Sequence, residues 1–274
     1  NTTEAMKNFR MVMAHDEEQF LPALELCWRV LPDAGRLLDE AIPARADSYL
    51  DFLRFLMERD QPQGTDVVWD RLLGLKQSFA IERVFPYFNY LSKRGEGGRL
   101  LHAWRDLAEV EPTLRDYQPG ENRIVNGGFE LPVLGGGLDW RYQNLPDVMV
   151  TIDSTDFHDG QKSLSIAFDH AAVSDVGIVQ YIPAEPNTRY EFVAYARVED
   201  LESESGPRFK VADVHSGTTL LVTEDLLGTS PWKEFRQSFT TGPETRLLGL
   251  RVVRSRGTSI IRGKLLIDDI RIAR

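Results

Sequence analysis

The hydrophobic pattern of the chain changes its period near the middle, and this change limits the fold more than any other feature. Before residue 112, apolar residues recur three and four positions apart, as in Phe20, Leu24 and Trp28. From about residue 121 they alternate with polar residues, as in 190–198. The first spacing indicates amphipathic helices, and alternation indicates half-buried strands. The sequence therefore predicts an α+β protein, with an all-α domain followed by an all-β domain.

The helical half contains the motif Trp-x-x-Leu three times, beginning at Trp28, Trp69 and Trp104. Breaks that contain Pro or Gly separate the helices of each pair. The repeat resembles tetratricopeptide-like helical hairpins, whose period is about 34 residues. The resemblance implies stacked hairpins that share a core and offer a groove or edge to a protein partner. Packing between hairpins is the alternative to a ligand contact for each tryptophan.

Turn residues and polar segments set the predicted boundaries. We expect a helical repeat domain over 1–112, a polar linker over 113–122 and a β-sandwich over 123–274. Short strands separated by turns such as Arg256–Gly257 are typical of a sandwich or jelly roll. The C-terminal half is therefore predicted to be an all-β jelly-roll sandwich.

Charge and composition exclude some classes of partner. The net charge is −10, which argues against nucleic acid, because binding to phosphates needs a basic surface. No apolar run reaches about 18 residues, so no membrane segment is expected. The first residues have neither an initiator Met nor a leader, so we expect the numbering to begin inside a longer protein. The single cysteine, Cys27, lies in an apolar helical run and is predicted to be a buried thiol.

The C-terminal half contains an ordered set of motifs that span nearly all of 123–274, namely 124–130, 135–140, 158–166, 179–182, 188–192, 232–235 with 239–241, and 266–270. Taken together and in this order, they resemble galactose-binding-like carbohydrate-binding modules. The resemblance implies a jelly roll that binds a polysaccharide or glycan, in a periplasmic, cell-envelope or secreted protein.

Strand alternation gives candidate sugar contacts. One face of 190–197 is apolar and is expected to face the core: Tyr190, Phe192, Ala194 and Ala196. In many relatives one sheet face forms the sugar site, so Tyr195 and Arg197 on the opposite face are candidates, with Arg251 expected on a neighbouring strand. Arg141 and Tyr142 supply an aromatic ring and a planar cation for sugar hydroxyls. Trp140 and Trp232 are interpreted as core residues.

The resemblance also implies a structural calcium ion. The implied ligands are Glu130, Asp159, the carbonyl of Lys162, and Asp268 or Asp269. Oxygen ligands of this kind suit calcium rather than zinc. The alternative is a dry site in which Glu130 pairs with a nearby Lys or Arg.

The sequence favours a binding protein over an enzyme. None of the five histidines forms a pair at metal-ligand spacing, and the glycines at 135–137 lack the Lys that a phosphate loop needs. We therefore predict a non-catalytic protein that binds poly- or oligosaccharide, with the helical repeat as a scaffold. The alternative is a protein-interaction or structural envelope protein whose sandwich no longer binds sugar. An enzymatic parent chain remains open, because carbohydrate-binding modules often accompany hydrolases.

Overall fold

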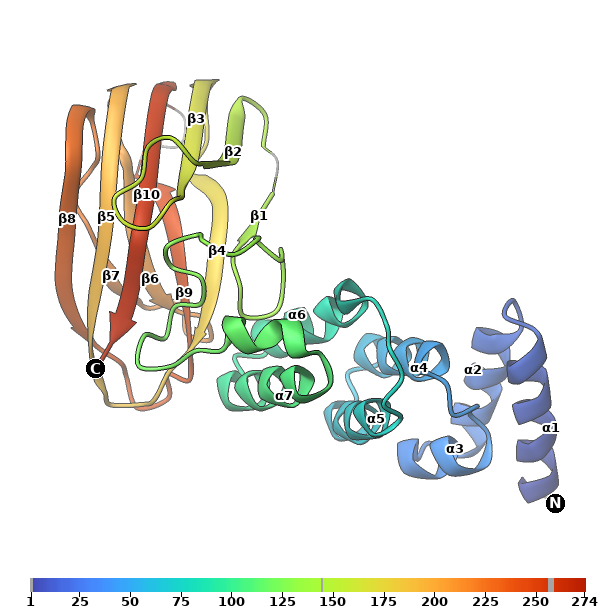
Figure 1. Ribbon diagram of the computed structural model, residues 1–274. Coiled ribbons are helices and arrows are strands. Elements are labelled where there is room, and N and C mark those ends of the chain that lie inside the picture. Colours follow the sequence, from blue (N-terminus) through green and yellow to red (C-terminus); the bar gives the residue numbers. More distant parts are fainter. Residues whose placement is uncertain (1, 144, 256–258) are drawn as a thin grey trace. The chain divides into compact units, whose positions relative to one another are not determined.

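Figure 1 shows a computed structural model of the protein, which describes residues 2–143, 145–255 and 259–274. The turn predicted at Arg256–Gly257 lies outside the described residues. The chain divides into two compact units: Asn1–Tyr90 with Asp106–Pro112, and Leu91–Arg105 with Thr113–Arg274. We call them the helical unit and the sandwich unit. None of the helices in the described part of the chain is long and apolar enough to cross a membrane.

The predicted helices are present throughout the N-terminal half. Asp33 accepts a hydrogen bond from the amide of Arg36 and so caps one of them, and Pro62 begins another. The elements in chain order are α1 (Thr2–His15), α2 (Phe20–Val30), α3 (Ala34–Glu40), α4 (Ala46–Glu58), α5 (Pro62–Gly74), η1 (Ile81–Val84), α6 (Phe85–Lys93), α7 (Gly97–Val110) and η2 (Pro112–Tyr117). This confirms a helical N-terminal half, whereas the tetratricopeptide resemblance stays a prediction.

Aromatic packing holds the helical unit together. The ring of Trp69 lies 4.9 Å from that of Tyr87 and 5.7 Å from that of Phe88, measured between centroids. Trp28 meets two phenylalanines of α4 edge to face. Cys27 is fully buried, as predicted. Trp69 therefore packs between helices of neighbouring pairs. This is the packing role that the sequence offered as the alternative to a ligand contact.

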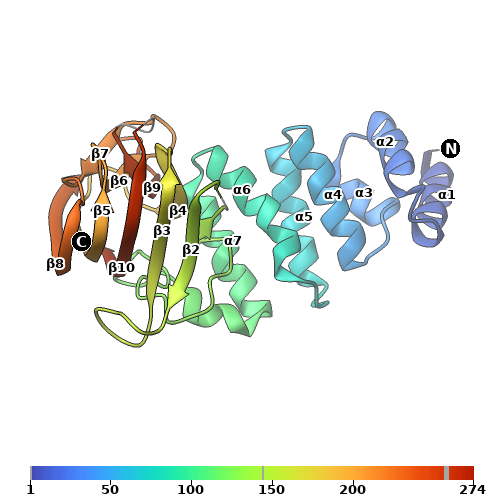
Figure 2. The same cartoon turned by 90° about the horizontal axis from the view of Figure 1, so that it is seen from above.

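The sandwich unit consists of two antiparallel five-stranded sheets, seen as two layers in Figure 2. The β4 sheet has the order β1-β4-β9-β6-β7, and the β5 sheet has the order β2-β3-β10-β5-β8. The strands are β1 (Arg141–Tyr142), β2 (Val148–Asp153), β3 (Ser163–Ala171), β4 (Asp175–Pro183), β5 (Arg189–Glu202), β6 (Pro207–Asp213), β7 (Thr219–Val222), β8 (Gly228–Thr240), β9 (Leu247–Arg254) and β10 (Ile261–Ala273). The predicted two-domain α+β class is thus confirmed.

The inner faces of the two sheets form one hydrophobic core. All four β5 residues predicted to face inward are buried, namely Tyr190, Phe192, Ala194 and Ala196. Trp140 is also buried, as predicted, and its ring centroid lies 5.3 Å from that of Phe129. Alternation along β5 therefore assigned the inner and outer faces of this strand correctly.

Part of the helical sequence belongs to the sandwich unit. Trp104 of α7 is fully buried, and its indole N–H donates to the carbonyl of Tyr117 at 2.8 Å. A Cβ added to Gly137 would lie only 2.0 Å from the Trp104 ring. The hydroxyl of Tyr117 in turn donates to the carbonyl of Pro132 at 2.7 Å. The segment predicted as a linker thus contains η2, which packs on the sandwich.

Candidate functional site

A loop covers the outer face of the β5 sheet, where Tyr195 and Arg197 lie. The segment between β2 and β3 crosses in front of β10 in Figure 1. His158 in this segment stacks on Tyr195 with 3.5 Å between ring centroids. Arg197 pairs with Asp156 of the same segment at 2.9 Å and with Glu199 at 3.0 Å. Both predicted contact residues are therefore engaged by the protein itself.

Trp232 is not a core residue, in contrast to the prediction. It is half-buried on edge strand β8, where its indole N–H donates to Asp156 at 3.0 Å and its ring meets His158 edge to face at 6.0 Å. Large aromatics are usually buried in a core, but here Asp156 and His158 of the β2–β3 segment contact Trp232 outside the sheet. His158, Tyr195 and Trp232 together form what we call the loop latch.

Arg251 does not neighbour Tyr195, so the predicted placement was wrong. Arg251 lies on β9 of the β4 sheet, whereas Tyr195 lies on β5 of the opposite sheet. Strand alternation separates inner from outer faces but does not say to which sheet a strand belongs. Arg141 and Tyr142 form β1 at the edge of the β4 sheet, and Tyr142 is 41% exposed. The five predicted contacts are thus divided between the outer faces of two sheets.

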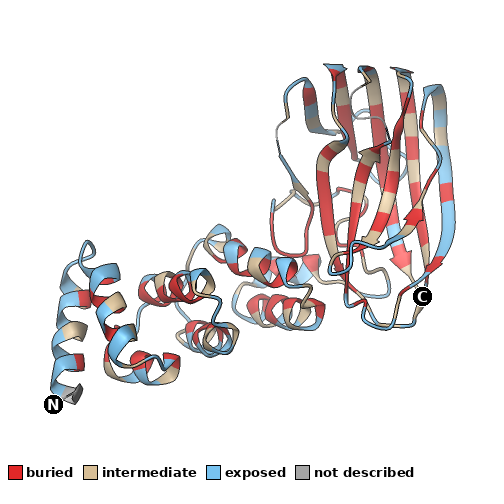
Figure 3. Ribbon diagram, turned by 180° about the vertical axis from the view of Figure 1, so that it is seen from behind, coloured by how far each residue is buried: buried red, intermediate tan, exposed pale blue. Residues whose placement is uncertain are grey.

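The outer face of the β4 sheet carries a row of residues at one register. Arg141 pairs with Val179, Val179 with Arg251, and Arg251 with Lys210, so the row crosses four strands. Residues directly opposite one another in a ladder share a face. The residues that flank Arg251 and Lys210 along β9 and β6 lie in the core, so the row points outward. Figure 3 shows this alternation as red and tan bands.

An aromatic ring adjoins the row. Tyr181 lies two residues after Val179 on β4, is partly exposed, and pairs with Gly249 on β9. The Arg141 guanidinium carbon lies 4.8 Å from the Tyr181 ring centroid. Because Gly249 has no side chain, nothing from that position covers the ring. The outer face thus places an aromatic ring beside a planar guanidinium, which is the chemistry that sugar recognition uses.

Neighbouring groups hold the cations of this face in place. Arg141 donates to the carbonyl of Gly137 at 2.7 Å, and burial lowers the pKa of its guanidinium. Arg251 pairs with Asp175 at 2.9 Å. The Asp175 carboxylate also accepts the amide of Gly177 at 2.8 Å. These contacts therefore hold the Arg141 and Arg251 side chains in fixed orientations.

Sequence reasoning missed Tyr181 and Lys210. Tyr181 belongs to the motif 179–182, one of those that carry the family resemblance. Alternation around the buried residues Ile178 and Ile182 would have placed Tyr181 outward. For Lys210 the corresponding signal is the pair of buried neighbours Phe209 and Val211.

The residues predicted to bind calcium lie near one another, but they already bond within the protein. A Glu130 carboxylate oxygen accepts the amides of Gln161 and Lys162 at 2.7 and 3.0 Å. The Lys162 ammonium donates to the Glu130 carbonyl at 2.6 Å. Gly160 has a φ of +68°, and a Cβ there would lie 2.2 Å from the Glu130 carboxylate. The carboxylate thus organises the β2–β3 turn through backbone amides.

The two aspartates of β10 are similarly engaged. Asp268 is fully buried and accepts the amides of His158, Asp159 and Asp269. Asp269 instead pairs with Arg271 at 2.6 Å. Among the described residues, no three Asp, Glu, His or Cys side chains form a group that could hold a metal ion. This arrangement does not fit the six to eight oxygen ligands that calcium prefers.

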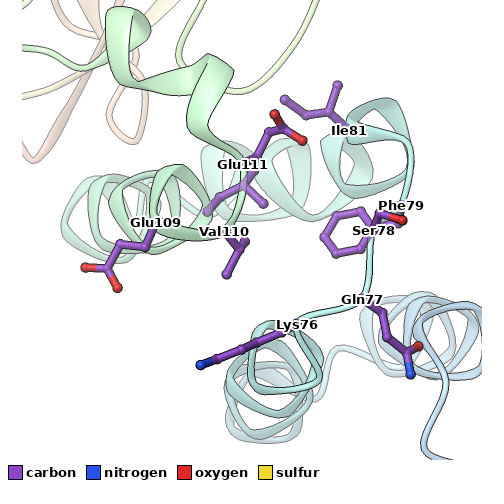
Figure 4. A pocket seen from close by; sticks show the side chains of 9 residues that line it. Lys76, Gln77, Ser78, Phe79, Ile81, Glu109, Val110 and Glu111 are labelled. Atoms are coloured by element: carbon purple, nitrogen blue, oxygen red, sulfur yellow. The ribbon is translucent and has the colours of Figure 1, made fainter.

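The helical unit has a cavity of about 420 Å³ next to the connection between α5 and η1. Figure 4 shows residues of this connection, such as Phe79, opposite the end of α7 at Val110. Lys76 and two glutamates, Glu109 and Glu111, add charge to a partly apolar lining. The cavity provides a second candidate site.

Comparisons with known proteins concern mainly the sandwich unit. Residues 121–253 match a family described as a carbohydrate binding domain. This match supports the predicted resemblance of the C-terminal half to carbohydrate-binding modules. None of the curated proteins matches the chain.

Three solved structures are similar to part of this chain. A CBM4 protein is 16% identical, with 55% of this chain and 98% of that chain covered and a TM-score of 0.42. The C-terminal family 22 carbohydrate binding module of Clostridium thermocellum Xyn10B is 16% identical, with coverage of 56% and 94% and a TM-score of 0.40. TmCBM61, solved in complex with β-1,4-galactotriose, is 22% identical, with coverage of 56% and 98% and a TM-score of 0.38.

Proposed function

We propose that this chain is a non-catalytic binding protein whose sandwich binds a poly- or oligosaccharide on the outer face of the β4 sheet. The observation that carries the proposal is the partly exposed ring of Tyr181, which lies opposite Gly249 and beside Arg141. An aromatic ring packs on the apolar face of a sugar, and an adjacent guanidinium bonds its hydroxyls. The family match over 121–253 supports this class of ligand.

The two outer faces differ in how much of their aromatic surface is free for a sugar. Tyr195 is stacked on His158 at 3.5 Å between centroids, so the loop latch uses its ring. The partly exposed ring of Tyr181 instead lies beside the Arg141 guanidinium, whose carbon is 4.8 Å from the ring centroid. Arg197 is likewise paired twice with carboxylates. We therefore assign the sugar to the β4 sheet, with Tyr142 as an additional contact at its edge.

A glycan array tests this proposal with the whole chain. The parent protein is expected to bind at least one poly- or oligosaccharide. Tyr181→Ala should lower that affinity at least about tenfold, as expected for loss of an aromatic anchor. Tyr195→Ala is the matched control and should keep the parent's affinity. Absence of binding to any glycan, or equal binding by Tyr181→Ala and the parent, would contradict the proposal.

We also propose that the helical unit is a scaffold that holds a protein partner. Its first two helices expose apolar side chains, including Met11 at 59%, Leu21 at 56% and Val30 at 62%. Exposed apolar patches of this kind mark interaction sites. A photo-crosslinking residue at Leu21 should capture one defined partner in the native host, whereas the same residue at Glu58 on α4 should not. Equal capture from both positions would contradict this assignment.

A further inference from the structure

The helical unit carries most of the negative charge of the protein. It has 18 acidic and 10 basic residues, which give it a net charge of −8, compared with −10 for the whole chain. Ion pairs within the unit cancel charges of both signs and leave this excess unchanged. A basic partner is therefore favoured over an acidic one, because complementary charge steers and orients two surfaces.

A cavity of about 310 Å³ in this unit gathers carboxylates from two parts of the chain. Glu17 lies in the connection between α1 and α2, and Asp47 and Asp51 lie one turn apart on α4. Two buried apolar residues, Met13 and Phe20, also line the cavity. This combination suits a long basic side chain, because its methylene stem packs on apolar surface while its charge meets a carboxylate.

Ser48 supplies a polar group to the same cavity that the fold leaves unused. The residue is only 3% exposed, and its hydroxyl has no hydrogen-bond partner among the described residues. Buried polar groups in folded proteins are nearly always hydrogen-bonded, and one that is not lowers stability. The hydroxyl is therefore available to accept an N–H from a ligand inside the cavity.

Two arginines of the cavity reduce its negative charge without removing it. Arg83 of η1 pairs with Asp47, and its guanidinium lies 4.0 Å from the carboxylate of Asp51. Arg45 donates instead to the carbonyl of Met13 at 3.3 Å. The three carboxylates of the lining thus outnumber its cations.

Glu17 and Asp51 keep negative charge available for a ligand. Within the described part of the chain, no cation lies at ion-pair distance from Glu17. Burial raises the pKa of Asp51, and the nearby cations Arg83 and Arg54 oppose this rise only in part, since the carboxylates of Asp47 and Glu17 add to it. A bound cation would therefore stabilise the ionised form of Asp51.

Exposed apolar residues adjoin the cavity. Val12, which is 42% exposed, precedes Met13 of the lining, and Leu21, which is 56% exposed, follows Phe20. Leu21 belongs to the surface proposed above to hold a protein partner. A partner that covers Leu21 thus lies next to the cavity.

We propose that the protein partner of the helical unit binds through a basic segment, with one Arg or Lys side chain in the cavity lined by Glu17, Ser48 and Asp51. This inference rests on the proposed scaffold function, since it names the chemistry of the partner and the place where it binds. Arginine suits the site best, because its several N–H groups can bond the Asp51 carboxylate and the Ser48 hydroxyl together. An apolar residue of the same segment covers Leu21.

A peptide library tests the chemistry of the partner with the whole chain. Each peptide has Arg, Lys, Gln or Glu at one central position, and the other positions are randomised in the same way. The chain should enrich peptides with a central Arg or Lys at least about tenfold over those with Gln, as expected for a charge-assisted hydrogen bond. Free arginine and spermidine should bind more weakly than the best peptide, because they lack the contact with Leu21.

Ser48→Ala tests the cavity itself. It should lower affinity for the best peptide about tenfold. Its melting temperature should equal or exceed that of the parent, because it removes an unpaired buried hydroxyl and alanine favours the helix. Asp51→Asn should also lower affinity about tenfold. Glu58→Gln removes a carboxylate from an exposed position of the same helix, and as the matched control it should bind like the parent.

Each outcome separates the basic segment from the scaffold function. If peptides with a central Gln or Glu are enriched as strongly as those with Arg or Lys, the partner is not basic. If Ser48→Ala and Asp51→Asn bind the best peptide like the parent, the cavity is not its site. Equal affinity for free arginine or spermidine and for the peptide would overturn the partner segment. In each of these cases crosslinking from Leu21 still decides the scaffold function, and both proposals fail if neither method finds a partner.

Discussion

Single residues of the sandwich unit have backbone and burial requirements that predict their response to substitution. Gly137 has a φ of +63°, and Trp104 fills the space beside it. Gly135 has a φ of +75°, but no atom lies within 4 Å of the position of a Cβ. The two glycines therefore share the left-handed conformation and differ in packing.

Substitution of these glycines separates backbone strain from steric overlap. Gly135→Ala should lower the free energy of unfolding by about 1 kcal/mol, because an L-residue is strained in the left-handed region. Gly137→Ala should lower it by about 3 kcal/mol, since the methyl group also displaces the Trp104 ring. Urea denaturation measures both values. Equal losses would show that Trp104 does not pack on Gly137.

Asp139 is expected to make stability depend on pH. The residue is fully buried, and this burial raises the pKa of its carboxyl from 3.8 to about 6. The folded state thus binds the proton more tightly than the unfolded state. Protonated Asp139 therefore stabilises the folded state, and this stabilisation is fully present below pH 3.8. It is lost as the pH rises through 6, which lowers the free energy of unfolding by about 3 kcal/mol.

Asp139→Asn should remove this dependence. Burial also raises the pKa of Asp268, so part of the pH effect remains in the variant. Urea denaturation from pH 4 to pH 7 should show the parent losing stability relative to Asp139→Asn as the pH rises. Parallel profiles for the two proteins would contradict a raised pKa at Asp139.

At the scale of elements, the β2–β3 segment and the β5 sheet form one unit. His158 stacks on Tyr195, Trp232 bonds Asp156, and Asp268 accepts two amides of the segment. Tyr195→Ala removes one aromatic pair, worth about 1 kcal/mol, and should raise amide hydrogen exchange within 154–162. Unchanged exchange together with lost glycan binding would instead make Tyr195 a sugar contact.

The same turn predicts the effect of metal removal. Glu130 and Asp268 are satisfied by backbone amides, so chelation with EDTA should leave the melting temperature unchanged. A bound ion would stabilise the folded state, and its removal would lower that temperature. If chelation lowers the melting temperature and added calcium reverses the decrease, the result would support the calcium site implied by the resemblance.

Elements and their faces could be predicted from the sequence better than the candidate site could. Alternation around Tyr190 and Phe192 identified the inner face of β5, because burial depends on local pattern. The sheet that contains Arg251 depends on long-range strand pairing, which alternation does not report. Trp232 was assigned to the core from residue type alone, since the latch partner His158 is far away in sequence. The row of residues that crosses β1, β4, β9 and β6 could not be predicted for the same reason, because its members come from separate strands.

At the scale of the whole molecule, the sandwich unit includes part of the helical sequence. Trp104 and Tyr117 precede residue 123, yet both are buried against the sandwich. A fragment of residues 91–274 should therefore resist urea better than a fragment of residues 123–274, which exposes the surface that Trp104 covers. Equal stability of the two fragments would show that α7 contributes nothing to the sandwich.

The account depends most on which face of the sandwich binds sugar. Affinity electrophoresis of the whole chain, through gels that contain the polysaccharide identified on the array, tests this directly. We predict that the parent and Tyr195→Ala are retarded equally, whereas Tyr181→Ala migrates as it does in a gel without polysaccharide. Full retardation of Tyr181→Ala, with free migration of Tyr195→Ala, would place the sugar on the β5 sheet and contradict the account.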